Sequence, residues 1–156
     1  MGALAGLAGN AAKLATVELA RRGKWTRVGG PQKAAGMLLA RASRSTPVGR
    51  VVGYLGDAVV ATVTGIGITY ALSMAGGSRA ALKGAIIGDA VWCFGYGALA
   101  SLGASRLDTA TSGEAVAEFI GHTVFGAVAG AVATCLGDPA LFDGTIPLTS
   151  PVPRQA

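Results

Sequence analysis

The sequence predicts an all-α integral membrane protein, a bundle of four transmembrane helices with a basic interfacial segment between the first and second. Composition leads to this prediction. Hydrophobic residues make up 51% of the 156 residues and charged residues only 13%, whereas charged residues reach about 25% in a typical soluble domain. The 25 glycines agree with it, because glycine is more frequent in transmembrane helices than in soluble ones.

Four hydrophobic segments account for most of the chain and cover about 2–20, 51–75, 82–104 and 114–136. Each is close to the ~20 residues that cross a hydrocarbon core of ~30 Å as an α-helix. The first is the weakest, since Lys13 and Glu18 interrupt it, and Asp89 interrupts the third. With their connections the segments form one predicted transmembrane domain over 1–137.

Small residues recur four positions apart, which predicts helices rather than barrel strands. Residues four apart share a helix face, and small ones let two helix backbones approach closely. Runs such as AVVATVTGIGITYALSMA lack the alternation that barrel strands require. We expect these faces to pack helices and to favour self-association; they contain Gly2 and Gly6, Gly49 and Gly53, Gly84 and Gly88, and Gly126 and Gly130.

The connection over 21–50 is basic and predicts contact with anionic lipid headgroups rather than with nucleic acid. Within it, PQKAAGMLLARASRS suits a short amphipathic helix that Pro31 opens, lying in the headgroup region or packed on the bundle. The positive-inside bias places this loop in the cytoplasm. Eight of the chain's 13 basic residues belong to it: Arg21, Arg22, Lys24, Arg27, Lys33, Arg41, Arg44 and Arg50.

The remaining connections are short. Residues 76–81 predict a tight turn, and 105–113 predict a polar turn in which Thr111 can begin the fourth helix. The tail over 138–156 is rich in proline and is predicted to be extended.

Ionisable side chains at membrane depth are the candidate functional residues. A charge at the bilayer centre costs roughly 2.5–3.5 kcal/mol on insertion scales, so such groups are usually paired, neutral or turned inward. Asp57 and Glu118 lie near segment ends and could reach the headgroups, whereas Asp89 needs a partner or a proton. The full set is Lys13, Glu18, Asp57, Asp89, Glu118 and His122.

Glu118 and His122 lie four apart in AEFIGHTVFGAVAG, on the ridge that continues through Gly126 and Gly130. They are therefore helical neighbours that can hydrogen-bond. One hypothesis is a clasp to another helix, with Asp57, Asp89 or Lys13 as its partner. The other is a proton-responsive or proton-conducting pair.

The sequence predicts neither an enzyme nor a metal or cofactor site. Cys93 and Cys135 have no metal-ligand spacing, and His122 is the single histidine. No P-loop or GxSxG motif is present. Trp92 and Tyr96, four apart, favour helix packing over a cofactor site.

Two parts of the chain resemble the YagU-type family of small bacterial inner-membrane proteins. GALAGLAGNAAKLATVE is similar to the family's first span, and LKGAIIGDAVWCFGY with EFIGHTVFG is similar to its later pair of helices. The resemblance covers about half the chain and implies a multi-span membrane protein without supplying a reaction. The positions that carry it are Lys13, Glu18, Glu118, Gly121 and His122.

We therefore expect a multi-pass protein of the bacterial cytoplasmic membrane. Its predicted role is structural or accessory, with self-association or docking to a larger membrane complex through small-residue helix faces. The alternative is a small proton-responsive channel or transporter that uses Glu118, His122 and Asp89.

Overall fold

The computed structural model describes residues 1–27, 30–39, 46–99 and 111–143. Within these ranges the chain is helical and contains no strand, which confirms the all-α prediction. Arg41, Arg44, the end of the third predicted segment, most of the polar turn and the tail after residue 143 lie outside the described residues. The elements are α1 (Gly2–Arg22), α2 (Gly30–Leu38), α3 (Pro47–Ala75), α4 (Ala80–Trp92), the π-helix η2 (Cys93–Leu99), α5 (Ser112–Leu136) and the 3₁₀ turn η3 (Pro139–Phe142).

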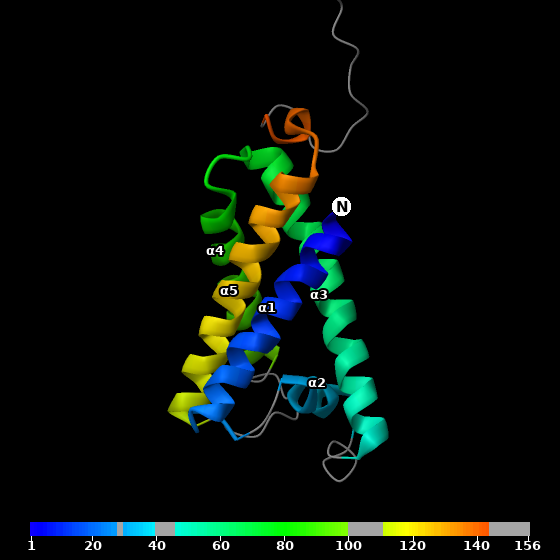
Figure 1. Cartoon of the computed structure of the whole chain (residues 1–156), viewed down its shortest axis with the longest axis vertical. Coiled ribbons are helices and arrows are strands. Elements are labelled where there is room, and N and C mark those ends of the chain that lie inside the picture. Colours follow the sequence, from blue (N-terminus) through cyan, green and yellow to red (C-terminus); the bar gives the residue numbers. More distant parts are fainter. Residues whose placement is uncertain (28–29, 40–45, 100–110, 144–156) are drawn as a thin grey trace, which may run out of the picture.

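The long helices form an elongated bundle (Figure 1). α1 lies between α3 and α5, and α4 packs against α5. The beginning of α1 and the end of α5 lie at one end of the bundle. At the opposite end, α2 lies across the bundle and packs against α3.

Local signals set the ends of the helices. The Thr111 hydroxyl accepts from the Glu114 amide while the Glu114 carboxylate accepts from the Thr111 amide, so a capping box begins α5 where the sequence predicts it. At the start of α3 the Thr46 hydroxyl accepts from the Gly49 amide at 3.0 Å, with Pro47 in the first turn. Gly76, with a φ of 80°, ends α3. The Lys83 ammonium then donates to the carbonyls of Ala75 and Gly76, at 2.7 and 2.8 Å.

The predicted glycine faces pack helices against one another inside this single chain. A Cβ on Gly84 of α4 would overlap the Gly126 carbonyl of α5, and one on Gly6 of α1 would overlap the Ala61 carbonyl of α3. Gly53 of α3 meets the Pro31 carbonyl of α2 equally closely. Gly2, Gly88 and Gly130 make similar contacts, and Gly49 is buried. These surfaces are therefore occupied within the chain.

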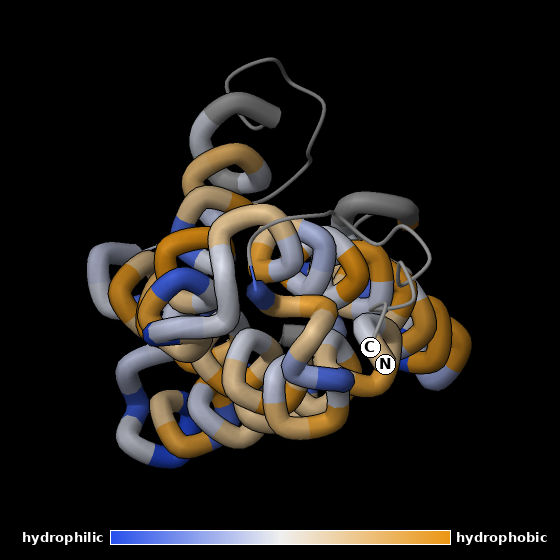
Figure 2. Tube along the Cα trace, turned by 90° about the horizontal axis from the view of Figure 1, so that it is seen from above, coloured by the Kyte–Doolittle hydropathy of each residue, from blue (hydrophilic) through white to orange (hydrophobic). Residues whose placement is uncertain are grey.

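Large hydrophobic side chains lie mostly on the outside of the bundle. The fully buried side chains of greatest volume are only Ile68, Leu72 and Ser73, and the core is otherwise dominated by alanine and glycine. Seen from above, the helices are hydrophobic over much of their length (Figure 2). On α3 the exposed residues recur every three or four positions and form a continuous stripe: Val48, Val51, Leu55, Val59, Val63, Ile66, Tyr70 and Met74.

Two of the four predicted spans, α3 and α5, are long and apolar enough to cross a membrane by length and composition. α1 and α4 do not meet the same criterion among the described residues. Both carry charged residues, and α4 as a regular helix ends after 13 residues. The prediction of helices is thus confirmed, while the full set of four spans is a proposal taken up below.

Two local features differ from the sequence predictions. The third segment changes from α-helix to π-helix at Cys93, where CFGYGAL contains two glycines. The beginning of the tail is not extended, because Asp138 caps η3 through a 2.9 Å bond from the Ala140 amide. Phe142 is buried, and its carbonyl accepts from the Gly77 amide at 2.8 Å. Hydrophobic burial and this bond hold the start of the tail against the bundle.

The close contact between Gly84 and Gly126 predicts that alanine substitutions at two glycines change the free energy of unfolding differently. Gly126→Ala should lower the free energy of unfolding by about 1–3 kcal/mol, because its methyl group would overlap the Gly84 backbone. Gly67→Ala on α3 meets nothing within 4 Å and should be neutral or stabilise by up to about 1 kcal/mol through helix propensity. Thermal unfolding of the purified variants measures both. Equal effects would contradict the packing.

Candidate functional site

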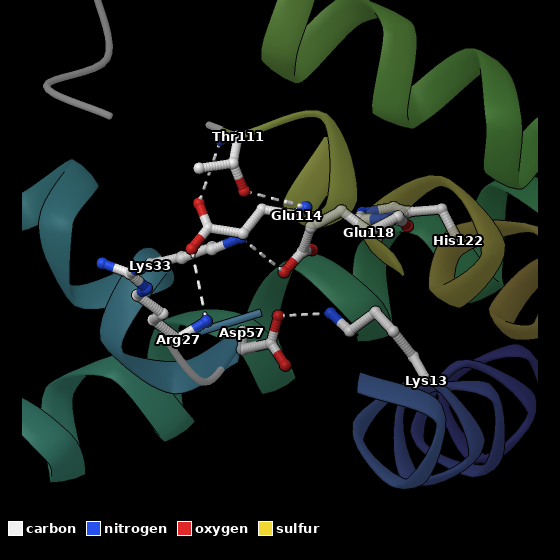
Figure 3. A network of polar contacts seen from close by, with 8 residues as sticks. All are labelled: Lys13, Arg27, Lys33, Asp57, Thr111, Glu114, Glu118 and His122. Carbon is white, nitrogen blue, oxygen red and sulfur yellow. Dashed lines mark hydrogen bonds and ion pairs between the residues drawn. The ribbon is translucent and has the colours of Figure 1, made fainter. Parts of the chain in front are cut away.

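Two ion pairs in the interior connect four helices. Lys13 of α1 donates to Asp57 of α3, with 2.5 Å between Nζ and Oδ1, and the two side chains are only 11% and 12% exposed. Lys33 of α2 faces Glu118 of α5, with 3.1 Å between Nζ and Oε1. Figure 3 shows the two pairs in one network with His122 beside Glu118. We call Lys13, Lys33, Asp57, Glu118 and His122 the interior polar cluster.

Small residues make room for this cluster. Gly121 of α5 lies against the Lys13 stem, where an added Cβ would lie 3.3 Å from Cγ. Gly53, one turn before Asp57, lets the start of α2 approach α3. That approach carries Lys33 to Glu118. The cluster therefore depends on positions at which the chain has no side chain.

The charges of the cluster balance, since two lysines face two carboxylates. Only part of their hydrogen-bonding capacity is used. Among the described residues Asp57 Oδ2 has no hydrogen-bond partner, and the Lys33–Glu118 contact is an ion pair without hydrogen-bond geometry. Removing such charges from water costs several kcal/mol per ion, and mutual attraction offsets this cost only when both partners are present.

His122 contacts the backbone of Glu118 rather than its carboxylate. Nδ1 lies 2.8 Å from the Glu118 carbonyl oxygen. Because a carbonyl can only accept, Nδ1 carries the hydrogen in this contact. The ring is also within electrostatic reach of Lys13 and Asp57. The two predicted neighbours thus belong to one cluster, but Glu118 uses its carboxylate to bind Lys33.

The connection after α1 is fastened to the first turn of α5. The Arg27 amide donates to Glu114 Oε1 at 3.3 Å. A Cβ on Gly113 would lie 2.8 Å from the Trp25 carbonyl oxygen. This part of the basic loop therefore packs on the bundle near the cluster.

The structure distributes the six predicted ionisable residues over three places. Lys13, Asp57, Glu118 and His122 meet in the cluster. Asp89 of α4 accepts a 2.6 Å bond from the Thr123 hydroxyl of α5, which supplies the partner that its depth requires. Glu18 lies at the exposed end of α1 and binds Arg21 and Arg22.

Two placements select between alternatives that the sequence left open, and one corrects a prediction. Asp57 and Glu118, which could reach the headgroups or join a clasp between helices, turn inward. Lys33, assigned with the headgroup-binding residues, has a side chain only 12% exposed because it pairs with Glu118. A carboxylate buried on α5 attracts the lysine inward more strongly than the open surface does.

Residues that the sequence analysis missed include Asn10 and Thr123. Asn10 is only 6% exposed, one turn before Lys13, and its Oδ1 has no hydrogen-bond partner among the described residues. The spacing of small residues along α1 could have identified Asn10 as a buried residue. Gly6, Gly9, Asn10, Lys13 and Val17 follow one face of α1, and all five are buried. The small residues on a helix thus identify which polar residues face inward.

Aromatic and metal-ligating residues add no second site in the described ranges. Trp92 packs edge-to-face on Phe119, with 5.4 Å between ring centroids. In the part of the chain that the structure describes, no group of three or more His, Cys, Asp or Glu residues is placed to hold a metal ion. Cys93 and Cys135 are exposed and carry free thiols.

No family model, curated protein or solved structure matches this chain. The resemblance to the YagU-type family therefore stays a prediction. What the site can do is argued from its own geometry.

Removing one partner of the Lys13–Asp57 pair should destabilise far more than removing both. Lys13→Met leaves a buried carboxylate without its cation and should cost about 3–5 kcal/mol, whereas Lys13→Met with Asp57→Leu should recover most of that loss. Denaturant unfolding of the single and double variants measures the coupling free energy. Strictly additive effects would contradict a buried pair.

Proposed function

We propose that this chain is a multi-pass integral membrane protein in which α1, α3, α4 with η2, and α5 all cross the bilayer. The observation that supports it is the distribution of polarity. Charged residues pair inside the bundle, while the long apolar stripe of α3 faces outward. In water this arrangement would expose hydrocarbon and bury charge; in lipid both groups of residues are in favourable surroundings.

The two helices that are less apolar fit the same arrangement. α1 is 21 residues long, enough to span about 30 Å, and its Lys13 is turned inward. Its exposed residues include Leu4 and Leu7. α4 is prolonged by η2, so its helical path continues to Leu99. Helices whose charges are buried can cross lipid beside more apolar neighbours.

The proposed location is the bacterial cytoplasmic membrane, with the basic loop on the cytoplasmic side. Arg21 and Arg22 end α1, and Lys24 and Arg27 follow it, at the end of the bundle where α2 lies. Lys83, at the other end, weighs little against this orientation because its ammonium caps the carbonyls at the end of α3. The YagU-type resemblance agrees with such a protein.

The role that the geometry supports best is that of a structural or accessory membrane protein. The interior polar cluster joins α1, α2, α3 and α5, which is what a clasp between helices does. The glycine faces are occupied within the chain. Assembly with further copies or with a larger complex would therefore use the outer apolar faces, with the α3 stripe as the longest of them.

A proton-responsive function is the second candidate, and the state of the cluster favours it. Asp57 Oδ2 is buried and lacks a hydrogen-bond partner among the described residues, and His122 lies beside Glu118. Imidazole is the side chain whose charge ordinarily changes near neutral pH, and ionisable groups inside membrane proteins often form proton relays.

Membrane integration and assembly state are tested together. We expect the full chain to stay in the membrane pellet after alkaline carbonate extraction. Light scattering of the detergent-extracted particle, corrected for bound detergent, then gives its protein mass. Release by carbonate would refute the membrane proposal, and a particle of one chain without any partner would refute assembly.

Flux in liposomes separates the two roles. Under the structural role, vesicles that contain the protein should leak protons no faster than empty vesicles at any pH from about 5 to 8. Under the proton-responsive role a pH-dependent flux appears, and His122→Asn abolishes it. Thr134→Val, on the same face of α5 but outside the cluster, serves as the control and should leave flux unchanged.

A further inference from the structure

We propose that a cavity between α1, α2 and α3 binds the phosphate group of an anionic phospholipid. The inference rests on the proposed position in the membrane and adds to it a defined site and ligand. The cavity has a volume of about 570 Å³, within the range of about 300–1,000 Å³ that is usual for ligand sites. Its charged and polar walls include Arg21, Arg27, Arg50, Glu18 and Tyr54.

The cavity is positively charged because its arginines outnumber its single acid. Glu18 is already engaged, accepting from Arg21 at 2.6 and 2.7 Å and from Arg22 at 3.1 Å. Arg27 bonds Glu114 through its backbone amide only. Among the described residues no carboxylate pairs with the guanidinium of Arg27 or of Arg50. Arg27 and Arg50 thus line one cavity, and neither guanidinium is paired with a carboxylate in the part of the chain that the structure describes.

Phosphate is the anion that suits these walls. A guanidinium group binds phosphate oxygens through two parallel N–H bonds, and two such groups suit a group with several acceptor oxygens. Pro31 and Gln32 bring the first turn of α2 to the same cavity.

The shape of the cavity selects a lipid rather than a free phosphate. Arg21 lies in the last turn of α1, Arg27 in the connection after it and Arg50 in the first turn of α3, at the end of the bundle where α2 lies. Leu14, Ala15 and Val17 line the part of the cavity that lies nearer the middle of α1. Outside the cavity, Val51 and Leu55 belong to the exposed α3 stripe. A ligand with a phosphate at one end and acyl chains at the other meets both parts.

Titration of the full chain in neutral detergent tests the proposal. The ligands are short-chain phosphatidylglycerol, phosphatidylcholine with the same chains, and glycerol phosphate; bound molecules are followed by native mass spectrometry. We expect phosphatidylglycerol to bind at least tenfold more tightly than the other two. Equal binding of glycerol phosphate would overturn the lipid assignment, and equal binding of phosphatidylcholine would overturn recognition of the anion.

Charge variants locate the site. Arg27→Gln with Arg50→Gln should weaken phosphatidylglycerol binding by about tenfold or more. Arg79→Gln removes one charge from an exposed position that lies outside both the cavity and the basic loop and should leave binding within about twofold. An equal loss in this variant and in the double variant would reduce the effect to non-specific attraction and overturn the site.

A third variant should raise the affinity for phosphatidylglycerol instead of lowering it. Glu18→Gln frees Arg21 from its acid and should tighten phosphatidylglycerol binding severalfold. A misfolded variant would lose binding, so a gain cannot come from damage; an unchanged or lower affinity would overturn the site. Carbonate extraction separates this proposal from the preceding one. If the wild type stays in the membrane but shows no phosphatidylglycerol preference, the headgroup site alone is refuted.

Discussion

The close approach of helix backbones at glycine is the constraint on which the rest of this structure depends. At Gly84 and Gly126, and at Gly6 and Ala61, the backbones are so near that a methyl group would overlap a carbonyl. These contacts leave little interior for large side chains, so the hydrophobic residues that a soluble bundle would bury lie outside. The same closeness brings α1, α3 and α5 within reach of one another's polar side chains. The interior polar cluster and the apolar exterior therefore have a common origin.

Burying the interior polar cluster costs desolvation free energy, and the pairing of its charges offsets part of that cost. Each buried cation has a carboxylate from another helix, so that no net charge remains inside. Each of these pairs is broken when one helix moves away, which makes the ion pairs sensitive to the relative placement of the helices. Lys33 belongs to the same system, although α2 lies across the end of the bundle. The position of this short helix is thereby linked to α5 through the Lys33–Glu118 ion pair.

Much of the fold could be predicted from the sequence, because hydrophobic length and small-residue spacing are local signals. The four hydrophobic segments correspond to α1, α3, α4 and α5, and Thr111 is the N-cap of α5. For the site, only the participating residues could be predicted, and not which of them pair. Lys13, Asp57, Glu118 and His122 were identified as ionisable residues at membrane depth, but their pairing is between elements far apart in sequence. Lys33 was assigned to the headgroup region instead, because a lysine in a basic loop has the same local signal whether it faces solvent or a buried acid. The π-helix after Trp92 and the turn at Phe142 likewise depend on local backbone geometry and tertiary burial.

α1 carries charged residues both on its buried face and at its exposed end. Lys13, on the buried face, is paired with Asp57, whereas Glu18, at the exposed end, is paired with Arg21; Arg27 and Arg50 have no carboxylate partner among the described residues. Each acid on these helices is thus assigned to a cation, and the positive charge that remains lies at the end of the bundle where the basic loop lies. Unpaired positive charge at this end of the bundle suits a membrane protein. Anionic headgroups lie at the membrane surface, whereas a charge nearer the bilayer centre would have to be paired. The distribution of charge along α1 and α3 therefore agrees with the orientation proposed from the basic residues of the loop.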